Sequence, residues 1–423
     1  MLGALSSVLL IAVSTAASAA QPRQEPAAQP TIVIVGERIQ DYRDRLAACL
    51  ARNCAPNEDI DATAALAEAL FVQGEYPEAR TVLQRSIGRN RRHAARYPEP
   101  VSDLYRANAR VARHLGFDDD ARRSTWEILR SLRAGLPQED HRHFTARLEI
   151  VESLIAFGQY YEAERELREL AGLARAAGRD DVVASAELRG LWIAFIQAPT
   201  SDSPVRRLVE MSESPDARRS LGAKIMLVRI YNHRGDRNRA NALIAQLGMS
   251  GTRRQLLFNP PYELIQREDT SATSGRSASV QSALNRSPPP RGQSRTSNLL
   301  TANIADRMTD NFDDQMIDVG FRIRADGAVA DVQIVNRRGS SGWDEPLLQS
   351  LAGRRYSPSQ DGSETYRLER YTYTSERRLH GLTGTHISNR SPRGRVEFHE
   401  LSETNLPAAQ APAAATPAGS PGS

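Results

Sequence analysis

Apolar residues recur at helical spacing through residues 60–250, which predicts an all-α region made of helix pairs. The clearest pair covers residues 62–87, where two apolar helical faces flank Gly74. A second clear copy surrounds Gly158. Weaker copies surround two further glycines, Gly116 and Gly235. One helix pair cannot bury such faces alone, so neighbouring pairs are expected to stack into a solenoid.

The small and large apolar residues around these glycines resemble the pattern of the tetratricopeptide repeat. Gly74, Gly116 and Gly158 are 42 residues apart (116 − 74 and 158 − 116), whereas the usual unit has about 34. We therefore expect longer helices or connections than the consensus has. With a degenerate pair at 183–212, the repeat pattern predicts about five helix pairs.

After a Ser-, Pro- and Arg-rich stretch, the apolar period changes to two, which is typical of strands. Apolar residues alternate with polar ones at Ile317, Val319, Phe321 and Ile323. Asp326-Gly327 suits a hairpin turn, and residues 329–336 suit the return strand. A leucine-rich helix is expected over 346–351, and another strand over 364–374.

This order of elements resembles the C-terminal domain of the TonB energy-transducer family. The motifs that carry the resemblance are Asp326-Gly327, Ser340-Ser341-Gly342, the leucine-rich helix, Arg355-Tyr356-Ser357-Pro358 and the strand 366–373. The Tyr-Pro pair that usually precedes the first strand is replaced by "DNFDDQ". The resemblance implies that a sheet edge binds an extended protein segment by strand addition.

The resemblance places the receiving edge on the last strand. The residues expected to bind a partner there are Tyr366, Leu368, Arg370, Tyr371 and Tyr373. Leu368 falls on the opposite face from Tyr371 and Tyr373, so the apolar residues of this strand do not all lie on one face.

The predicted fold class is therefore α+β multidomain, with an N-terminal all-α helical-repeat solenoid and a small α+β domain similar to the TonB C-terminal domain. The expected boundaries are a signal peptide (1–20), an extended leader with a short strand (21–40), helical repeats (41–250), a disordered basic linker (270–297), the TonB-like domain (298–378), and an irregular segment with a disordered tail (379–423).

The first twenty residues are uncharged and apolar, and they end in small residues that suit cleavage at Ala19 or Ala20. The strongly apolar part is shorter than the roughly 20 residues of a spanning helix. This indicates export to the periplasm of a Gram-negative bacterium. The alternative is an uncleaved anchor that holds the protein in the inner membrane, facing the periplasm.

Cys49 and Cys54 are the only cysteines. Export places them in an oxidising compartment, where they are expected to form a disulfide at the end of a helix. The alternative is a pair of unbonded, buried thiols. Two cysteines without nearby histidines do not make a zinc site, and no metal or cofactor is expected.

Charge and motifs favour neither an enzyme nor a nucleic-acid-binding protein. The formal net charge is +4, and the basic run at 88–96 is narrow enough to be a solvated helix face. His141 and His143 point to different sides of a predicted helix start, so a solvated cap is expected there. The late histidines, His380, His386 and His399, have no evident partners in sequence.

The run "TIVIVGE" at 31–37 is a lone β-branched segment ahead of the helices. It resembles the TonB box of outer-membrane receptors. One interpretation is that it adds as a strand to the 298–378 sheet, within one chain or between two. The alternatives are a disordered leader and an extended piece packed on the first helix.

These observations predict a non-catalytic periplasmic binding or scaffold protein. Its helical repeats would bind protein partners of the cell envelope, and its TonB-like domain would bind extended segments, for instance from outer-membrane receptors. The alternative is a TonB-type energy transducer that couples an inner-membrane motor to those receptors, with residues 1–20 as the anchor. No catalytic residues are identified.

Overall fold

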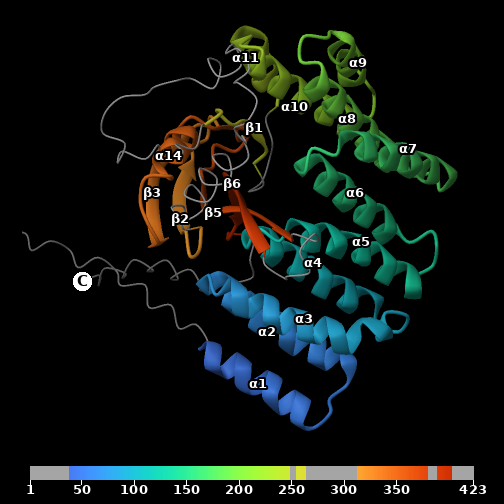
Figure 1. The fold of residues 1–423 in the computed structure, drawn as a ribbon. Helices are drawn as coiled ribbons and strands as arrows, with labels where there is room; N and C mark the ends of the chain where they lie inside the picture. The colour runs from blue at the N-terminus through green and yellow to red at the C-terminus, as the bar shows by residue number, and fades with distance from the viewer. Residues whose placement is uncertain (1–37, 248–253, 263–311, 380–387, 403–423) are drawn as a thin grey trace, which may run out of the picture. The chain divides into compact units, whose positions relative to one another are not determined.

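The computed structural model describes residues 38–247, 254–262, 312–379 and 388–402. Its helical region contains α1 (Ile39–Ala51), α2 (Pro56–Gln73), α3 (Tyr76–Asn90), the 3₁₀ turn η1 (Arg91–His93), α4 (Pro98–His114), α5 (Asp118–Gly135), α6 (His141–Ala156), α7 (Tyr160–Ala176), α8 (Asp180–Gln197), α9 (Ser203–Ser212), α10 (Ala217–His233) and α11 (Arg237–Ile244) (Figure 1). Within these described ranges, no helix is both long and apolar enough to cross a membrane.

The helices from α2 to α11 form five consecutive pairs, as the repeat pattern predicted. The pair expected at 183–212 is α8 with α9. The leader expected at 21–40 ends slightly earlier than predicted, because α1 already begins at Ile39. Its strand at 31–37, the signal peptide at 1–20 and the linker at 270–297 lie outside the described residues.

A left-handed glycine follows the first helix of each of the first three pairs. Gly74, Gly116 and Gly158 have φ values of +81°, +78° and +70°. Each is followed by an amide that reaches back to a helix carbonyl, as Glu75 N–H does to Leu70 O at 2.8 Å. A side chain is strained in this backbone conformation, which explains the recurring glycine.

Ion pairs link neighbouring repeats at a nearly constant sequence separation. They are Arg80–Asp120 at 2.7 Å, Arg110–Glu68 at 2.5 Å, Arg106–Glu149 at 3.0 Å and Arg189–Glu152 at 2.6 Å. Partly exposed pairs of this kind contribute roughly 0–1 kcal/mol each. The buried apolar faces supply the main stabilisation, and the pairs favour one register of stacking.

The second region is built on an antiparallel four-stranded sheet in the order β3-β2-β5-β6. Its elements are β2 (Met316–Ile323), β3 (Val329–Arg338), α14 (Glu345–Ala352), β5 (Thr365–Leu379) and β6 (Ser388–Glu400), with a separate two-stranded pair of β1 (Leu256–Phe258) and β4 (Arg355–Tyr356). Its apolar core includes Ile317, Val319, Phe321, Trp343, Leu347, Leu351 and Tyr371.

The two predicted hairpin strands, their Asp326-Gly327 turn, the leucine-rich helix and the strand after it are all present. Two boundaries were wrong. Residues 388–400 form the long strand β6, although 379–423 was expected to be irregular. Strand β1, which precedes the predicted linker, pairs with β4, so the sheet region also recruits the segment around residues 256–258.

The sheet region contacts the turns of the first two helix pairs. A Cβ atom placed on Gly74 would lie 2.7 Å from Met316 Sδ, and one on Gly116 would lie 1.9 Å from Ser375 O. The backbone N–H of Arg377 donates to Gly116 O at 2.7 Å. A Cβ atom on Gly158 would meet no atom within 4 Å. The same turn glycine therefore acts as a packing position only in the first two pairs.

We expect Gly116→Ala to lower the thermal midpoint of unfolding clearly more than Gly158→Ala does. Both substitutions place a side chain at positive φ, at a cost of roughly 1–2 kcal/mol. Only the first also displaces the backbone of β5. Differential scanning calorimetry of both variants measures the difference. Equal shifts would show that the contact between Gly116 and β5 adds nothing to stability.

Candidate functional site

The strand predicted to be the open edge, β5, is an internal strand. It pairs with β2 along residues 365–372, and with β6 along 369–379. Every residue of β5 outside the bulge between Ser375 and Arg377 is therefore paired with at least one neighbouring strand, and residues 369–372 are paired on both sides, which corrects the expectation of a receiving edge there. β6, the next strand in the chain, pairs with the edge of β5 at which the TonB resemblance predicted that a partner strand would bind.

The predicted partner-binding residues on β5 point to both faces of the sheet. Tyr371 and Tyr373 are buried beneath α14, and Tyr373 stacks on Trp343 with ring centroids 5.5 Å apart. Tyr371 donates a hydrogen bond to Glu369, whose carboxylate also accepts from Arg354 at 2.7 Å. Burial, reinforced by the Glu369 charge, raises the pKa of Tyr371 well above its ordinary value.

Two of the predicted residues lie at the exposed N-terminal end of β5. Tyr366 is 55% exposed, and Leu368 is half-buried. β2 pairs with both residues on one side, and on the other side Leu401 N–H donates to Leu368 O at 2.8 Å.

The remaining predicted residue, Arg370, is fully buried between the sheet and α2. Its Nε and Nη2 atoms donate to the two carboxylate oxygens of Asp318 at 2.6 and 2.7 Å. Its Nη1 atom donates to Phe71 O at 2.6 Å, near the C-terminal end of α2. A cation is favoured at this end, because the helix dipole leaves partial negative charge on the last carbonyls.

A polar and aromatic cluster lies beside this ion pair. Thr372 Oγ1 contacts Tyr76 OH at 3.1 Å and His114 Nδ1 at 2.8 Å. Phe71 packs edge-on against His114 and His399, with ring centroids 5.1 and 5.0 Å away. The polar side chains on this face of β5 therefore bind helices of the same chain rather than water.

The environment of the two histidines keeps them uncharged. Burial is the main cause that lowers the pKa of His399 to about 4, and the positive charges of Arg110 and Arg370 add to it. Burial also lowers the pKa of His114, assisted by His399 and Arg113. Sequence reasoning found no partner for His399, because its contacts on α2 and α4 lie about three hundred residues away in the chain.

Two strands remain at the edges of the described sheet, β3 and β6. The β3 ladder shifts register twice, and Asp331 adopts φ +54°. Such bulges hinder the addition of another strand. The β6 ladder is regular from Gly394 to Glu400, so β6 offers the more uniform open edge.

A cavity of about 280 Å³ lies between β6 and the helical region. It is lined by α4, α5 and α6 together with residues 397–399. Phe398, at its wall, is 49% exposed. β6 and the helical region therefore share one hollow.

A second hollow, of about 320 Å³, is formed by α5, α6 and α7 alone. Trp126 lines it and is 43% exposed. Arg123 and Arg165 also line it, and neither forms an ion pair with another described residue. Tryptophan and arginine are the residue types most enriched at the energetic centres of protein interfaces.

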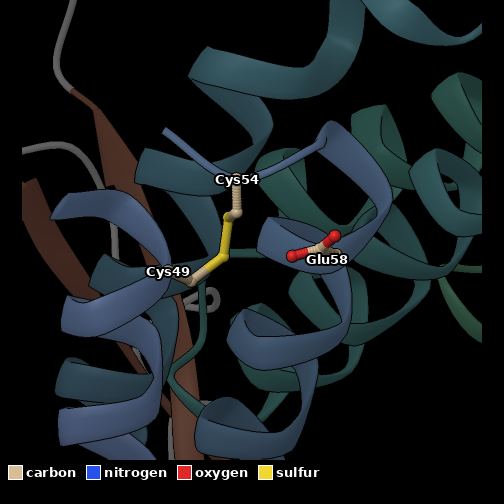
Figure 2. A group of neighbouring side chains, drawn as sticks. All are labelled: Cys49, Cys54 and Glu58. Carbon is tan, nitrogen blue, oxygen red and sulfur yellow. A yellow bond between two sulfur atoms is a disulfide. The ribbon is translucent and has the colours of Figure 1, made fainter. Parts of the chain in front are cut away.

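Cys49 and Cys54 are joined in a disulfide between α1 and the start of α2 (Figure 2). Glu58 lies beside the two sulfur atoms. Among the residues described, these three form the one group whose side chains are close enough together to bind a metal ion. The sulfurs are bonded to each other, so they provide no thiolate ligands here.

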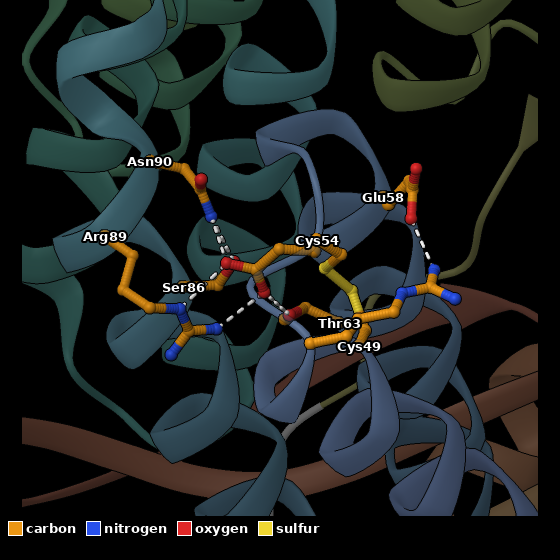
Figure 3. The surroundings of a disulfide bond; sticks show 9 residues. Cys49, Cys54, Glu58, Thr63, Ser86, Arg89 and Asn90 are labelled. Carbon is orange, nitrogen blue, oxygen red and sulfur yellow. Dashed lines mark hydrogen bonds and ion pairs between the residues drawn. A yellow bond between two sulfur atoms is a disulfide. The ribbon is translucent and has the colours of Figure 1, made fainter.

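Hydrogen bonds near the disulfide connect α2 to α3 (Figure 3). Asp59 accepts hydrogen bonds from Arg89, Asn90 and Thr63, which joins the start of α2 to the end of α3. Burial opposes ionisation of Asp59, but these donors outweigh it and lower the pKa of the carboxyl.

The histidines near residue 140 are only partly as expected. Asp140 caps α6 by accepting from Arg142 N–H at 2.9 Å, and His141 is exposed. His143, however, is buried and contacts Gln138 O through Nδ1 at 3.2 Å, so it is not a solvated residue. In the basic run 88–96, Arg91, Arg92 and Arg96 are exposed, which fits a solvated face.

No protein-family model and no curated protein matches the chain. Among solved structures, a Podosopora anserina protein described as a kinesin light chain with nearly identical TPR-like repeats is 17% identical over 45% of this chain and 93% of its own, with a TM-score of 0.33. BtubC (BKLC) from P. vanneervenii is 14% identical over 49% and 84%, with a TM-score of 0.35.

A Rap protein complexed with competence and sporulation factor is 11% identical over 49% of this chain and 62% of its own, with a TM-score of 0.33. Because all these TM-scores are low, the helical-repeat architecture is taken from the helix pairs described above.

We expect Arg370→Met to lower the free energy of unfolding by about 3–5 kcal/mol, because it leaves Asp318 charged, buried and unpaired. Arg322→Met is the matched control, since Arg322 forms exposed pairs with Asp331 and Glu364 on the same sheet. It should cost less than about 1 kcal/mol. Urea unfolding measures both.

The double variant Arg370→Met with Asp318→Leu should recover part of the loss, because it removes the unpaired charge as well. A loss for Arg370→Met no larger than that of the control would contradict a structural role for the buried pair.

Proposed function

We propose that this protein is a non-catalytic scaffold whose helical repeats bind a protein partner in the cell envelope. The observation that carries the proposal is the hollow between α5 and α7, with an exposed tryptophan and two arginines that form no ion pair with described residues. We assign the helix pairs to the tetratricopeptide-like class because their glycine turns and apolar faces follow that pattern.

Among the described residues, the turn glycines of the first two helix pairs, Gly74 and Gly116, pack against the sheet. The third turn, at Gly158, has open space around it and lies next to the α5–α7 hollow. A partner can therefore reach this part of the repeat surface without displacing the sheet.

The sheet region supports a second binding activity, the addition of an extended segment to an open edge. The resemblance to the TonB C-terminal domain motivates this proposal, and β2, β3, α14 and β5 occur in the order it requires. Because β6 covers the expected edge, binding would take place on β6 instead. Main-chain hydrogen bonds would supply much of the affinity of such a complex.

We place the protein in the periplasm, on the composition of residues 1–20. The alternative remains an energy transducer anchored in the inner membrane by those residues. Sequencing the mature N-terminus separates the two: we expect a chain that begins at Ala20 or Gln21. A chain that retains residues 1–20 would favour the transducer.

We expect Trp126→Asp in the full chain to abolish the capture of partner proteins by proximity labelling in cells. The substitution places a charge where the proposed surface makes an apolar contact. Val209→Asp is the matched control, since Val209 is an exposed apolar residue on α9, away from the hollow. Mass spectrometry compares both variants with the unmodified protein. Capture that is equally strong in both variants would contradict the proposed surface.

A further inference from the structure

A further hollow, of about 580 Å³, is formed by α3, η1, α4 and α5. No residue of the described sheet lines this α3–α5 hollow. Among the described residues, Arg123 is the one that lines both it and the α5–α7 hollow. The two hollows therefore lie next to each other on the helical region but are built from different side chains.

The floor of the α3–α5 hollow consists of buried polar side chains. They are at most 8% exposed and comprise Tyr105, Asn108, Ser124 and Ser131. Asn108 Nδ2 donates to Ser124 Oγ at 2.9 Å, but Asn108 Oδ1 is buried and has no hydrogen-bond partner among the described residues. The opposite orientation of the amide would leave its NH₂ group without a partner instead. A buried polar group without a partner is costly, so this floor favours a ligand that forms hydrogen bonds.

Tyr105 adds a neutral hydroxyl group to this floor. Its burial, together with the negative charge of Glu127, raises the pKa of the hydroxyl above its ordinary value. The hydroxyl therefore keeps its proton at neutral pH and can donate a hydrogen bond. The positive charges of Arg91 and Arg130 act on the same pKa in the opposite direction, so the hydroxyl lies near two arginines that line the hollow.

The rim of the α3–α5 hollow is positively charged. Arg91, Arg92 and Arg123 line it and are exposed, and none of the three forms an ion pair with another described residue. A guanidinium group donates two parallel hydrogen bonds to a carboxylate or a phosphate, so these side chains favour a ligand with such a group.

The two acidic side chains that line the hollow do not compensate this charge. Asp120 pairs with Arg80 at 2.7 Å, and Glu127 pairs with Arg130 at 2.5 Å. Each acid thus has its own arginine, and the three arginines of the rim remain available to an anion.

We propose that the α3–α5 hollow binds an acidic sugar, a hydroxyl-rich ligand that carries a carboxylate or phosphate group. The arginines of the rim bind the anionic group, and Tyr105 and Asn108 bind the hydroxyls. A hydroxyl both donates and accepts, so it satisfies the Asn108 amide in either orientation. An acidic side chain of a protein brings the charge but no hydroxyls, so it would leave the floor without partners. This activity is additional to the proposed binding of a protein partner.

Isothermal titration calorimetry of the full chain tests the proposal with D-glucuronate and D-glucose 6-phosphate. We expect at least one of these acidic sugars to bind at least about tenfold more tightly than glucose, because glucose lacks the group that the arginines bind. The tighter of the two identifies the anionic group as a carboxylate or a phosphate. Inorganic phosphate and a di-glutamate peptide should bind at least about tenfold more weakly than that sugar, because neither satisfies the floor.

Two substitutions place the binding in the α3–α5 hollow. Arg91→Gln should raise the dissociation constant of the tighter sugar at least about tenfold, because it removes a charged hydrogen-bond donor. Tyr105→Phe keeps the buried ring and should raise it about threefold or more, because it removes one neutral hydrogen bond. Arg85→Gln is the matched control, since Arg85 is an exposed arginine of α3 that does not line the hollow. It should leave the dissociation constant unchanged.

The proposal is overturned if neither acidic sugar binds, or if glucose, inorganic phosphate or the peptide binds as tightly as the better sugar. A loss of affinity that is as large in Arg85→Gln as in Arg91→Gln would also overturn it. Neither Arg91 nor Tyr105 lines the α5–α7 hollow, so these outcomes leave the proposed protein-binding surface untouched. Conversely, normal capture of partners by the Trp126→Asp variant would not affect the sugar site.

Discussion

The buried guanidinium of Arg370 fixes how the sheet contacts the helical repeats. It binds Asp318 within the sheet and Phe71 O on α2, so one side chain joins two regions that lie about three hundred residues apart. A buried charge is costly unless all its hydrogen bonds are satisfied, which makes any other placement of β5 on α2 unfavourable. Thr372 continues the same face with contacts to Tyr76 and His114.

This contact divides the repeat surface into two parts. The turns at Gly74 and Gly116 are covered by Met316 and Ser375, and the turn at Gly158 is open. The repeated glycine is required everywhere for its positive φ, but only the first two also allow a strand to approach. The described strands of the sheet thereby cover the first two turns of the helical region, and they do not line the α5–α7 hollow.

Periodicity predicted most of the elements and part of the candidate site. Apolar residues that recur about every 3.6 positions predicted the helix pairs and the leucine-rich helix. Apolar residues at every second position predicted the 326–327 hairpin and strand β5. Strand β6 was missed because Ser388–Glu400 carries few apolar residues and contains Pro392 and Gly394, which normally interrupt a strand. Without β6, the partner-binding edge was assigned to β5, which is an internal strand.

The sequence by itself determined the local conformations, because glycine at positive φ, apolar periodicity and the short hairpin turn act over a few residues. It also determined that the odd and even faces of β5 differ, since Tyr371 and Tyr373 alternate with Arg370 and Thr372. Only the tertiary structure decided what the polar face binds. Its partners are the carbonyl oxygen of Phe71, the hydroxyl of Tyr76 and the imidazole of His114. They lie far from β5 in the chain, and no local pattern in the sequence pairs them with it.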